Sequence, residues 1–383
     1  MTDENRFSSE KSPKQYSMRT FATTSTLGGK LEGKLEVFGE TKLGLDYYRR
    51  NWNATTAMFM EKISMFKNQS SIPDVDTKNI GAFIQQKKGF TDKLKLTAGL
   101  RLDNTHTKAK KDRRSFYGLY FKNANNAKTD TYLSGNVQLD YDIAKRLNVY
   151  AGFGHTVRPP DPQERYFALQ RMGTRVKPDK AGNPKLKPVK NDEFDIGITY
   201  KEGRVLFNSR FFYSDLTDFI VVRDIYCSER YARTYKNKDA RIYGNETSAR
   251  LALPFNVFAS ARISCARGKN DLDGTDLPEI PPIKGNLKLR YDNGSCFGEI
   301  EGLFAAAQDK LDIEIAEEKT SGFAIASLRA GYYYKSLRIF SGINNVFNKK
   351  YYEHLSYLRD PFRSGIRVPE PGRTFYVSLR YKF

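Results

Sequence analysis

The last fifteen residues of the chain, "PEPGRTFYVSLRYKF" (369–383), alternate between two kinds of side chain. Apolar or aromatic residues fall at every second position, at Phe375, Val377, Leu379, Tyr381 and Phe383. Most of the residues between them are polar or charged. A period of two is typical of a β-strand with one apolar and one polar face, whereas an amphipathic helix repeats about every 3.6 residues. The chain therefore ends on an amphipathic strand.

The same period recurs along the whole chain. In "KLKLTAGLRLDN" (93–104), leucine and alanine fall on one face, and charged, polar or small residues fall on the other. A helical period is absent from these segments. On this basis we predict fifteen strands, at residues 22–37, 40–52, 79–87, 93–107, 131–142, 146–157, 191–200, 204–222, 240–252, 256–267, 282–291, 295–308, 322–333, 336–347 and 372–383.

The connections between these strands alternate between short and long. Tight turns such as "KEGR" (201–204) and "DNGS" (292–295) alternate with long polar loops at about 53–78, 108–130, 158–190, 223–239, 268–281, 309–321 and 348–371. This predicts an all-β fold, an antiparallel up-and-down transmembrane β-barrel of the bacterial outer membrane, with periplasmic turns and extracellular loops. A soluble array of β-sandwiches is the alternative, but it gives no reason for the tight turns to share one end.

Composition agrees with a membrane barrel. No stretch of 18 apolar residues occurs, which excludes a helical membrane span but not a barrel. The 64 Lys and Arg residues outnumber the 44 Asp and Glu residues, and they are spread over every segment. This spread fits a polar lumen and a surface among the anionic phosphates of outer-membrane lipid and lipopolysaccharide. We therefore predict no nucleic-acid partner.

The first and last predicted strands do not form an antiparallel pair that would close a barrel. An antiparallel barrel of bacterial type needs an even number of strands, and fifteen is odd. The first residues, "MTDENRFSSEKSPKQYS" (1–17), also lack the basic start and apolar run of a secretory signal peptide. We predict the C-terminal part of a larger barrel, with residues 1–21 a remnant of an extracellular loop and 22–383 the barrel part. The last strand would then pair with a strand upstream of residue 1, and not with 22–37.

Four stretches, in the same order and spacing, resemble the TonB-dependent outer-membrane receptors, which import scarce metals and metal chelates. They are "TAGLRLDN" (97–104), "HTVRPPDPQERYFAL" (155–169) with "GNPKLKPVKNDEFDIGITY" (182–200), "INNVFNKKYYEHLS" (343–356) and the C-terminal stretch. The resemblance covers nearly the whole chain. It implies a barrel of 22 strands, of which about 15 would lie here, and substrate binding from the outside.

Two features of that family have no counterpart in this sequence, namely the N-terminal plug domain and the short box that the energy-coupling protein grips. The resemblance implies that the TonB-ExbB-ExbD complex would act through the missing plug. It also implies that the outer-membrane barrel assembly machinery would recognise the terminal Phe383.

The amino-acid sequence of several stretches looks most like that of the copper-type receptors of the family. These stretches are "STLGGKLEG" (25–33), "RYFAL" (165–169), "EHLS" (353–356) and "PEPGRTF" (369–375). Siderophore receptors, which take up ferric chelates, share many of the same barrel motifs and remain the alternative. A passive porin or adhesin barrel without a plug is a further alternative.

Three of the six methionines, Met58, Met60 and Met65, lie within "MFMEKISMF" (58–66), in a predicted extracellular loop. Thioethers are soft ligands that favour Cu(I), so such a cluster is a candidate copper site. The alternative is that these residues form the apolar face of a packed loop. The transported metal would be a substrate, and we predict no resident cofactor.

The three histidines, His106, His155 and His354, are predicted near the outer ends of two strands and in the last long loop. Imidazole binds copper, zinc and nickel, so each is a candidate metal ligand. Their spacing in the sequence does not by itself define a site.

The stretch "RPPDPQERYF" (158–167) opens a long loop with several charges. Arg158, Glu164, Arg165 and Tyr166 are candidate substrate-binding residues at the barrel mouth. An architectural role, with the charges pairing across the mouth, is the alternative.

No catalytic motif occurs in the sequence, which lacks a nucleophile elbow, a P-loop, an H-E-x-x-H zinc motif and a paired C-x-x-C. The three cysteines, Cys227, Cys265 and Cys296, do not have metal-binding spacing. We predict that the protein is not an enzyme.

Overall fold

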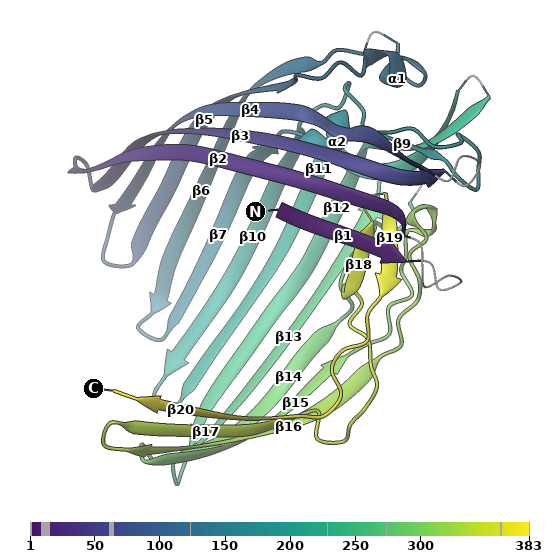
Figure 1. Cartoon of the computed structure of the whole chain (residues 1–383). Coiled ribbons are helices and arrows are strands. Elements are labelled where there is room, and N and C mark those ends of the chain that lie inside the picture. The colour runs from purple at the N-terminus through teal and green to yellow at the C-terminus, as the bar shows by residue number, and fades with distance from the viewer. Residues whose placement is uncertain are drawn as a thin grey trace.

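The computed structural model describes residues 2–8, 16–60, 65–122, 124–227, 229–272, 274–360 and 362–382. Eighteen strands form one large curved sheet, and two more form a small separate one. In Figure 1 the large sheet wraps round like a trough, with short turns at one end and the irregular elements gathered at the other. Among the described residues, no helix is both long and apolar enough to span a membrane.

The fifteen predicted strands are all present. They are β2 (Tyr16–Glu36), β3 (Glu40–Met60), β4 (Met65–Gly89), β5 (Leu94–Ala109), β6 (Ala127–Ala144), β7 (Leu147–Arg158), β10 (Val189–Glu202), β11 (Val205–Cys227), β12 (Arg230–Leu253), β13 (Val257–Asn270), β14 (Lys284–Asp292), β15 (Cys296–Ala305), β16 (Phe323–Tyr334), β17 (Leu337–Asn344) and β20 (Thr374–Tyr381). Each pairs antiparallel with the next in this series, which confirms the up-and-down topology.

The two edges of the sheet are formed by the first and last strands. A short strand, β1 (Thr2–Ser8), pairs antiparallel with the beginning of β2, so that β2 lies between β1 and β3. At the other edge, β20 pairs with β17. Figure 1 shows β2 and β20 at separate edges of the trough. This arrangement agrees with the expectation that the last strand does not pair with residues 22–37.

Several predicted boundaries were wrong because the strands continue into predicted loops. The loop expected at 53–78 is a strand as far as Met60 and again from Met65, and the loop expected at 223–239 is largely the end of the β11–β12 hairpin. Within the expected loop remnant 1–21, Thr2–Ser8 is a strand and β2 begins at Tyr16. Backbone pairing does not require an apolar face, so it continues where the side chains no longer alternate.

The two faces of the sheet differ as the sequence predicts. On one face, large apolar side chains are exposed and adjoin each other across strands, as do Leu43, Ile84 and Leu100, which are 40%, 44% and 56% exposed. The opposite face carries networks of ion pairs. In one of them, Arg101 binds Asp46 through two hydrogen bonds of 2.6 and 2.9 Å and also binds Asp103. These are the faces expected of a lipid-exposed wall and a polar lumen.

Aromatic rings on the polar face lie over glycines of the neighbouring strand. A Cβ atom on any of these glycines would overlap the ring opposite, so the close approach of ring and backbone requires glycine. The directly paired residues are Gly44 with Phe83, Gly197 with Tyr150, Gly244 with Phe212, Gly331 with Phe297 and Gly342 with Tyr376. These contacts fix the register of the wall, since a slip of one strand by one residue would turn its own partner in each pair to the other face.

The short elements lie at the end of the sheet opposite the tight turns (Figure 1). They are α1 (Arg114–Gly118), α2 (Pro162–Tyr166), β8 (Ala168–Leu169), β9 (Asp179–Ala181), the 3₁₀ turn η2 (Ile313–Ile315), β18 (Tyr357–Asp360) and β19 (Arg363–Arg367). β9 pairs parallel with the outer part of β12, beyond the point where β13 ends. It thereby covers hydrogen-bonding groups that would otherwise form an open sheet edge.

Candidate functional site

The long loops pack together at this end of the sheet into one apolar cluster, which we call the loop cluster. Its members come from the ends of β3, β4, β5 and β12, from the segment around α1 and from the segment 159–188. The buried members are Ala54, Ile72, Val75, Ala109, Phe116, Tyr117, Tyr120, Tyr166, Ala168, Ala181 and Ala232. This cluster is the reference for the positions of the candidate substrate-binding and metal-binding residues.

The helix α2 begins with a capping box. The Asp161 side chain accepts a hydrogen bond from the Gln163 backbone N–H, and the Glu164 side chain accepts one from the Asp161 N–H. Proline at the first helical position favours the same start. Glu164 also binds Arg158 through two hydrogen bonds of 2.9 and 3.1 Å, and Asp161 binds Arg50 of β3. The pairing of Arg158 is therefore local, while that of Asp161 crosses to another strand.

Arg165 and Tyr166 are completely buried. The Arg165 guanidinium lies 2.6 Å from the Asp130 carboxylate and donates to the Leu186 carbonyl. The Tyr166 carbonyl accepts a 2.6 Å hydrogen bond from the Tyr117 hydroxyl, and burial raises the pKa of Tyr166 to about 12. Both residues hold the loop cluster together in this arrangement. A role of either side chain in substrate contact stays a prediction.

Asp179 is the most highly connected carboxylate of the cluster, and its side chain has no exposed surface. One oxygen accepts hydrogen bonds from the Tyr120 hydroxyl at 2.6 Å and from Arg230 at 2.7 and 3.2 Å. The other oxygen accepts a 2.6 Å bond from the Arg171 backbone N–H. Burial, together with the hydrogen bond to Asp179, raises the pKa of Tyr120, which keeps its hydroxyl protonated and able to donate.

A second ion pair joins this segment to the last long loop. Lys180 donates to both oxygens of Asp360, at 2.7 and 2.8 Å. Burial alone would raise the pKa of Asp360, but the nearby Lys180 charge, its hydrogen bonds and the Phe362 N–H hold that pKa below its usual range. The fully buried ring of Phe362 packs against Phe167 at 5.1 Å between ring centroids. Residues far apart in the sequence are thereby fixed to one another.

The three candidate histidines occupy separate places. His106 bonds to Thr129 at 2.9 Å, and His155 contacts Asp192 at 2.6 Å. His354 is buried and lies between Thr320 and Glu317, at 2.8 and 3.1 Å. Across the described part of the chain, no group of three or more histidine, cysteine or acidic residues could hold a metal ion. Their role as metal ligands stays a prediction.

The candidate methionines are brought together by strand register. Met58 and Met60 lie two residues apart on β3, Met58 is paired directly with Met18 of β2, and Met60 is paired with Met65 of β4. Residues two apart on one strand, and residues directly opposite on neighbouring strands, share a face of the sheet. Met18 and Met58 therefore share one face of the sheet, and the register sets Met60 opposite Met65, although the sequence predicted only a loop for Met58, Met60 and Met65.

That face is the one that looks towards the loop cluster. Next to the Met18 and Met58 pair, the Thr20 and Thr56 hydroxyls lie 3.0 Å apart. Ala54, two positions further along β3, is a buried member of the loop cluster. Met18 and Met58 thus continue the inward face of β2 and β3 beyond the packed loops.

Sequence reasoning missed the acidic residues that hold these loops, namely Asp130, Asp179 and Asp360. Asp130, Asp179 and Asp360 lie 35, 51 and 180 residues from their basic partners Arg165, Arg230 and Lys180. Neither their spacing nor the surrounding composition marks them. Only the capping box at Asp161 and Glu164 has a local signature, with an acidic residue three positions before a glutamate and a proline between them.

Residues 2–346 match the family model described as TonB dependent receptor-like, beta-barrel. Among solved structures, the chain is similar to the copper transporter OprC, with a TM-score of 0.79 and 26% identity over 96% of this chain and 58% of that one. It also resembles the ferric yersiniabactin uptake receptor FyuA from Yersinia pestis, with a TM-score of 0.68 and 13% identity over 96% and 56%. For the ferric-catecholate import receptor Fiu from K12 E. coli, the TM-score is 0.64 at 16% identity over 96% and 55%. The chain thus spans little more than half the length of these relatives.

Proposed function

Because the chain belongs to the TonB-dependent receptor β-barrel family, we propose that it supplies the C-terminal part of an outer-membrane receptor that takes up a metal ion or metal chelate. Residues 22–383 would form the wall, the polar lumen and most of the outer loops. Substrate binding would take place between these loops and a plug domain, and the TonB-ExbB-ExbD complex would act on that plug. Lipopolysaccharide would surround the loops, and the barrel assembly machinery would recognise Phe383, which lies outside the described residues.

We favour copper as the transported metal. The observation that carries this proposal is the strand register at the outer end of the sheet, which pairs Met18 with Met58 and Met60 with Met65. Thioethers brought together in this way would suit Cu(I) and not hard cations. The 26% identity to a copper transporter supports the same choice. Arg158, Glu164, Arg165 and Tyr166 would then position the segment 159–188 beside these methionines, whereas His106, His155 and His354 remain candidates for a second ligand type.

Uptake of copper by whole cells tests the receptor function. We expect cells that lack the complete receptor gene to accumulate less copper under copper limitation than the parent, and the complete gene to restore accumulation. Elemental analysis of washed cells measures this, with iron supplied as a ferric chelate in a parallel culture. Normal copper accumulation with reduced ferric-chelate uptake would favour the siderophore receptor instead. If neither changed, a passive porin or adhesin would be the better interpretation.

Replacing the four methionines by leucine tests the copper site. Leucine keeps the apolar volume but removes the thioether, so we expect Cu(I) binding by the complete receptor to weaken by at least about tenfold while the barrel still assembles. Competition with a Cu(I) chelator measures the affinity, and heat-modifiable migration on a gel measures assembly. Met172→Leu, which removes a thioether from an exposed loop residue, is the matched control. Equal affinities of the fourfold variant and the parent would rule the site out.

A further inference from the structure

The apolar outer face of the sheet contains a groove of about 640 Å³ that crosses strands β14 to β20. Its floor is a row of small residues that lie directly beside one another: Gly298 on β15, Ala330 on β16 and Ser341 on β17. Larger residues close the row at both ends, Tyr291 on β14 and Val377 on β20. A gap in the side-chain cover of a membrane-facing wall is thus built into three neighbouring strands.

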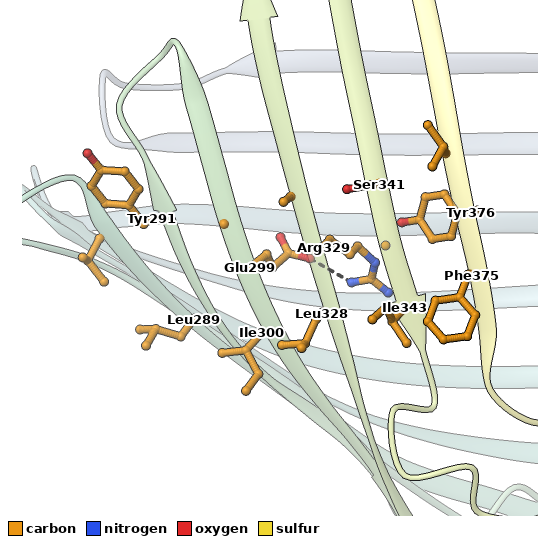
Figure 2. A pocket seen from close by; sticks show the side chains of 15 residues that line it. Leu289, Tyr291, Glu299, Ile300, Leu328, Arg329, Ser341, Ile343, Phe375 and Tyr376 are labelled. Carbon is orange, nitrogen blue, oxygen red and sulfur yellow. Dashed lines mark hydrogen bonds and ion pairs between the residues drawn. The ribbon is translucent and has the colours of Figure 1, made fainter.

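One wall of the groove is formed by the next row of residues. Leu289, Ile300, Leu328, Ile343 and Phe375 are cross-strand neighbours, and Figure 2 shows their side chains in a continuous line across the strands. The Glu299 and Arg329 side chains, which are ion-paired at 2.8 Å, alternate with this row on their strands and belong to the polar face. The surface of the groove is therefore mainly apolar.

Next to the groove, the outer face of β16 continues towards a short turn. Beyond Ala330, the same face of β16 carries Tyr332 and Tyr334, whose rings are stacked with an interplanar angle of 8°. Lys335 follows in the turn, and its ammonium group lies 5.4 Å from the centre of the Tyr334 ring. Aromatic rings followed by a cation are typical of the level at which a membrane changes from acyl chains to headgroups.

We propose that this groove binds one acyl chain of an anionic phospholipid, whose phosphate meets Lys335. The small floor residues admit the chain, the apolar row lies along it, and the two tyrosines lie at the level of the glycerol esters. The positive charge of Lys335 complements the headgroup. This proposal rests on the placement of the chain in the outer membrane, and it assigns the lipid to the leaflet that the short turns face.

A second copy of the chain is a less suitable occupant. Two barrels in one membrane are related by an axis along the membrane normal, so both Lys335 residues would lie at the same depth. A contact centred on this groove would bring the two like charges together at its rim, where they repel. A lipid phosphate, by contrast, neutralises the lysine.

Native mass spectrometry of the complete protein, released from vesicles of phosphatidylethanolamine and phosphatidylglycerol, tests the proposal. We expect the parent to retain one phosphatidylglycerol after mild delipidation. Ala330→Leu, which fills the floor, should lower this retention by about tenfold, and Lys335→Glu, which reverses the headgroup charge, by about fivefold to tenfold. Ala261→Leu is the matched control, because it fills a neighbouring groove of the same volume, about 640 Å³, on the same outer face. It should leave retention unchanged.

Equal retention by the parent, Ala330→Leu and Lys335→Glu would overturn the proposal, as would equal losses in Ala330→Leu and Ala261→Leu. If Ala330→Leu failed to assemble, the parent can be cross-linked with phosphatidylglycerol that carries a photoreactive acyl chain. Labelling should then concentrate on peptides from β15, β16 and β17, and uniform labelling of the wall would contradict the groove. Partition of the parent into detergent is measured separately, so that a failure of the membrane placement is distinguishable from a failure of the lipid site.

Discussion

Replacement of Asp179 by alanine should release the segment 159–188 from the loop cluster while the barrel wall stays intact. The variant leaves the Tyr120 hydroxyl and the Arg230 guanidinium without the carboxylate that both now contact. Breaking a buried, hydrogen-bonded ion pair by removing one partner costs about 3 kcal/mol or more. We therefore expect hydrogen exchange of the backbone amides in this segment to accelerate by about a hundredfold.

Asp112→Ala is the control for this experiment. Asp112 also pairs with an arginine, Arg114, in a neighbouring loop, but both side chains are more than half exposed. Ion pairs in that environment contribute little, so amide exchange should be unchanged. Similar exchange in the Asp179→Ala variant and the parent would show that the buried carboxylate does not hold the loops.

Replacement of Gly182 by alanine should have an effect of similar size through a different cause. A Cβ atom at this position would lie 2.6 Å from the Arg165 carbonyl carbon and 2.6 Å from the Phe167 nitrogen, and backbone atoms cannot turn aside as a side chain can. The Gly182 N–H also donates a 2.7 Å hydrogen bond to the Phe167 carbonyl. Separating residue 182 from the end of α2 should cost about 3 kcal/mol. Limited proteolysis within 159–188 of the folded receptor should detect this local opening.

Gly118→Ala provides the comparison. Gly118 ends α1 within the same group of loops, and a Cβ atom there would meet no other atom within 4 Å. We expect its proteolysis pattern to match that of the parent. Should Gly182→Ala also resist the protease, the close approach between residue 182 and α2 would not matter for the loop structure.

The wall of the barrel could be predicted from the sequence because membrane and lumen impose opposite demands on successive residues. In β5, for example, leucines alternate with charged and polar residues over most of the strand, and the predicted and observed bounds differ by only one or two residues. The outer parts of the strands, beyond the apolar band, could not be predicted. Residues 51–56, "NWNATT", have lost the alternation although they pair with β2 as regularly as those before them, because water replaces lipid outside and packed loops replace the open lumen inside.

The loop cluster could not be predicted, because its contacts join residues that no local pattern connects. Pairing of their charges across the barrel mouth was the architectural alternative for Arg158 and Arg165. Arg158 instead binds Glu164 within its own segment, while Arg165 does reach across, to Asp130. The sequence grouped Met58, Met60 and Met65 but placed them in a loop. The pairing of Met18 with Met58 and of Met60 with Met65 depends on strand register, which a sequence alone does not specify.

The length of the outer hairpins has a consequence for how this surface can change. β11 has 23 residues and is paired with β12 up to Cys227 and Arg230. At about 3.4 Å per residue, the length of β11 greatly exceeds the height of an apolar band, about 25 Å. Much of β11 therefore projects beyond the membrane as a hydrogen-bonded hairpin, and not as an irregular loop. One extra residue in a single strand there exchanges inward and outward positions up to the tip unless a bulge absorbs it, as the bulge between Leu216 and Phe219 of β11 does. Viable changes of length on this exposed surface should therefore come in even steps matched on both strands, or be accompanied by a bulge, except at the tips themselves.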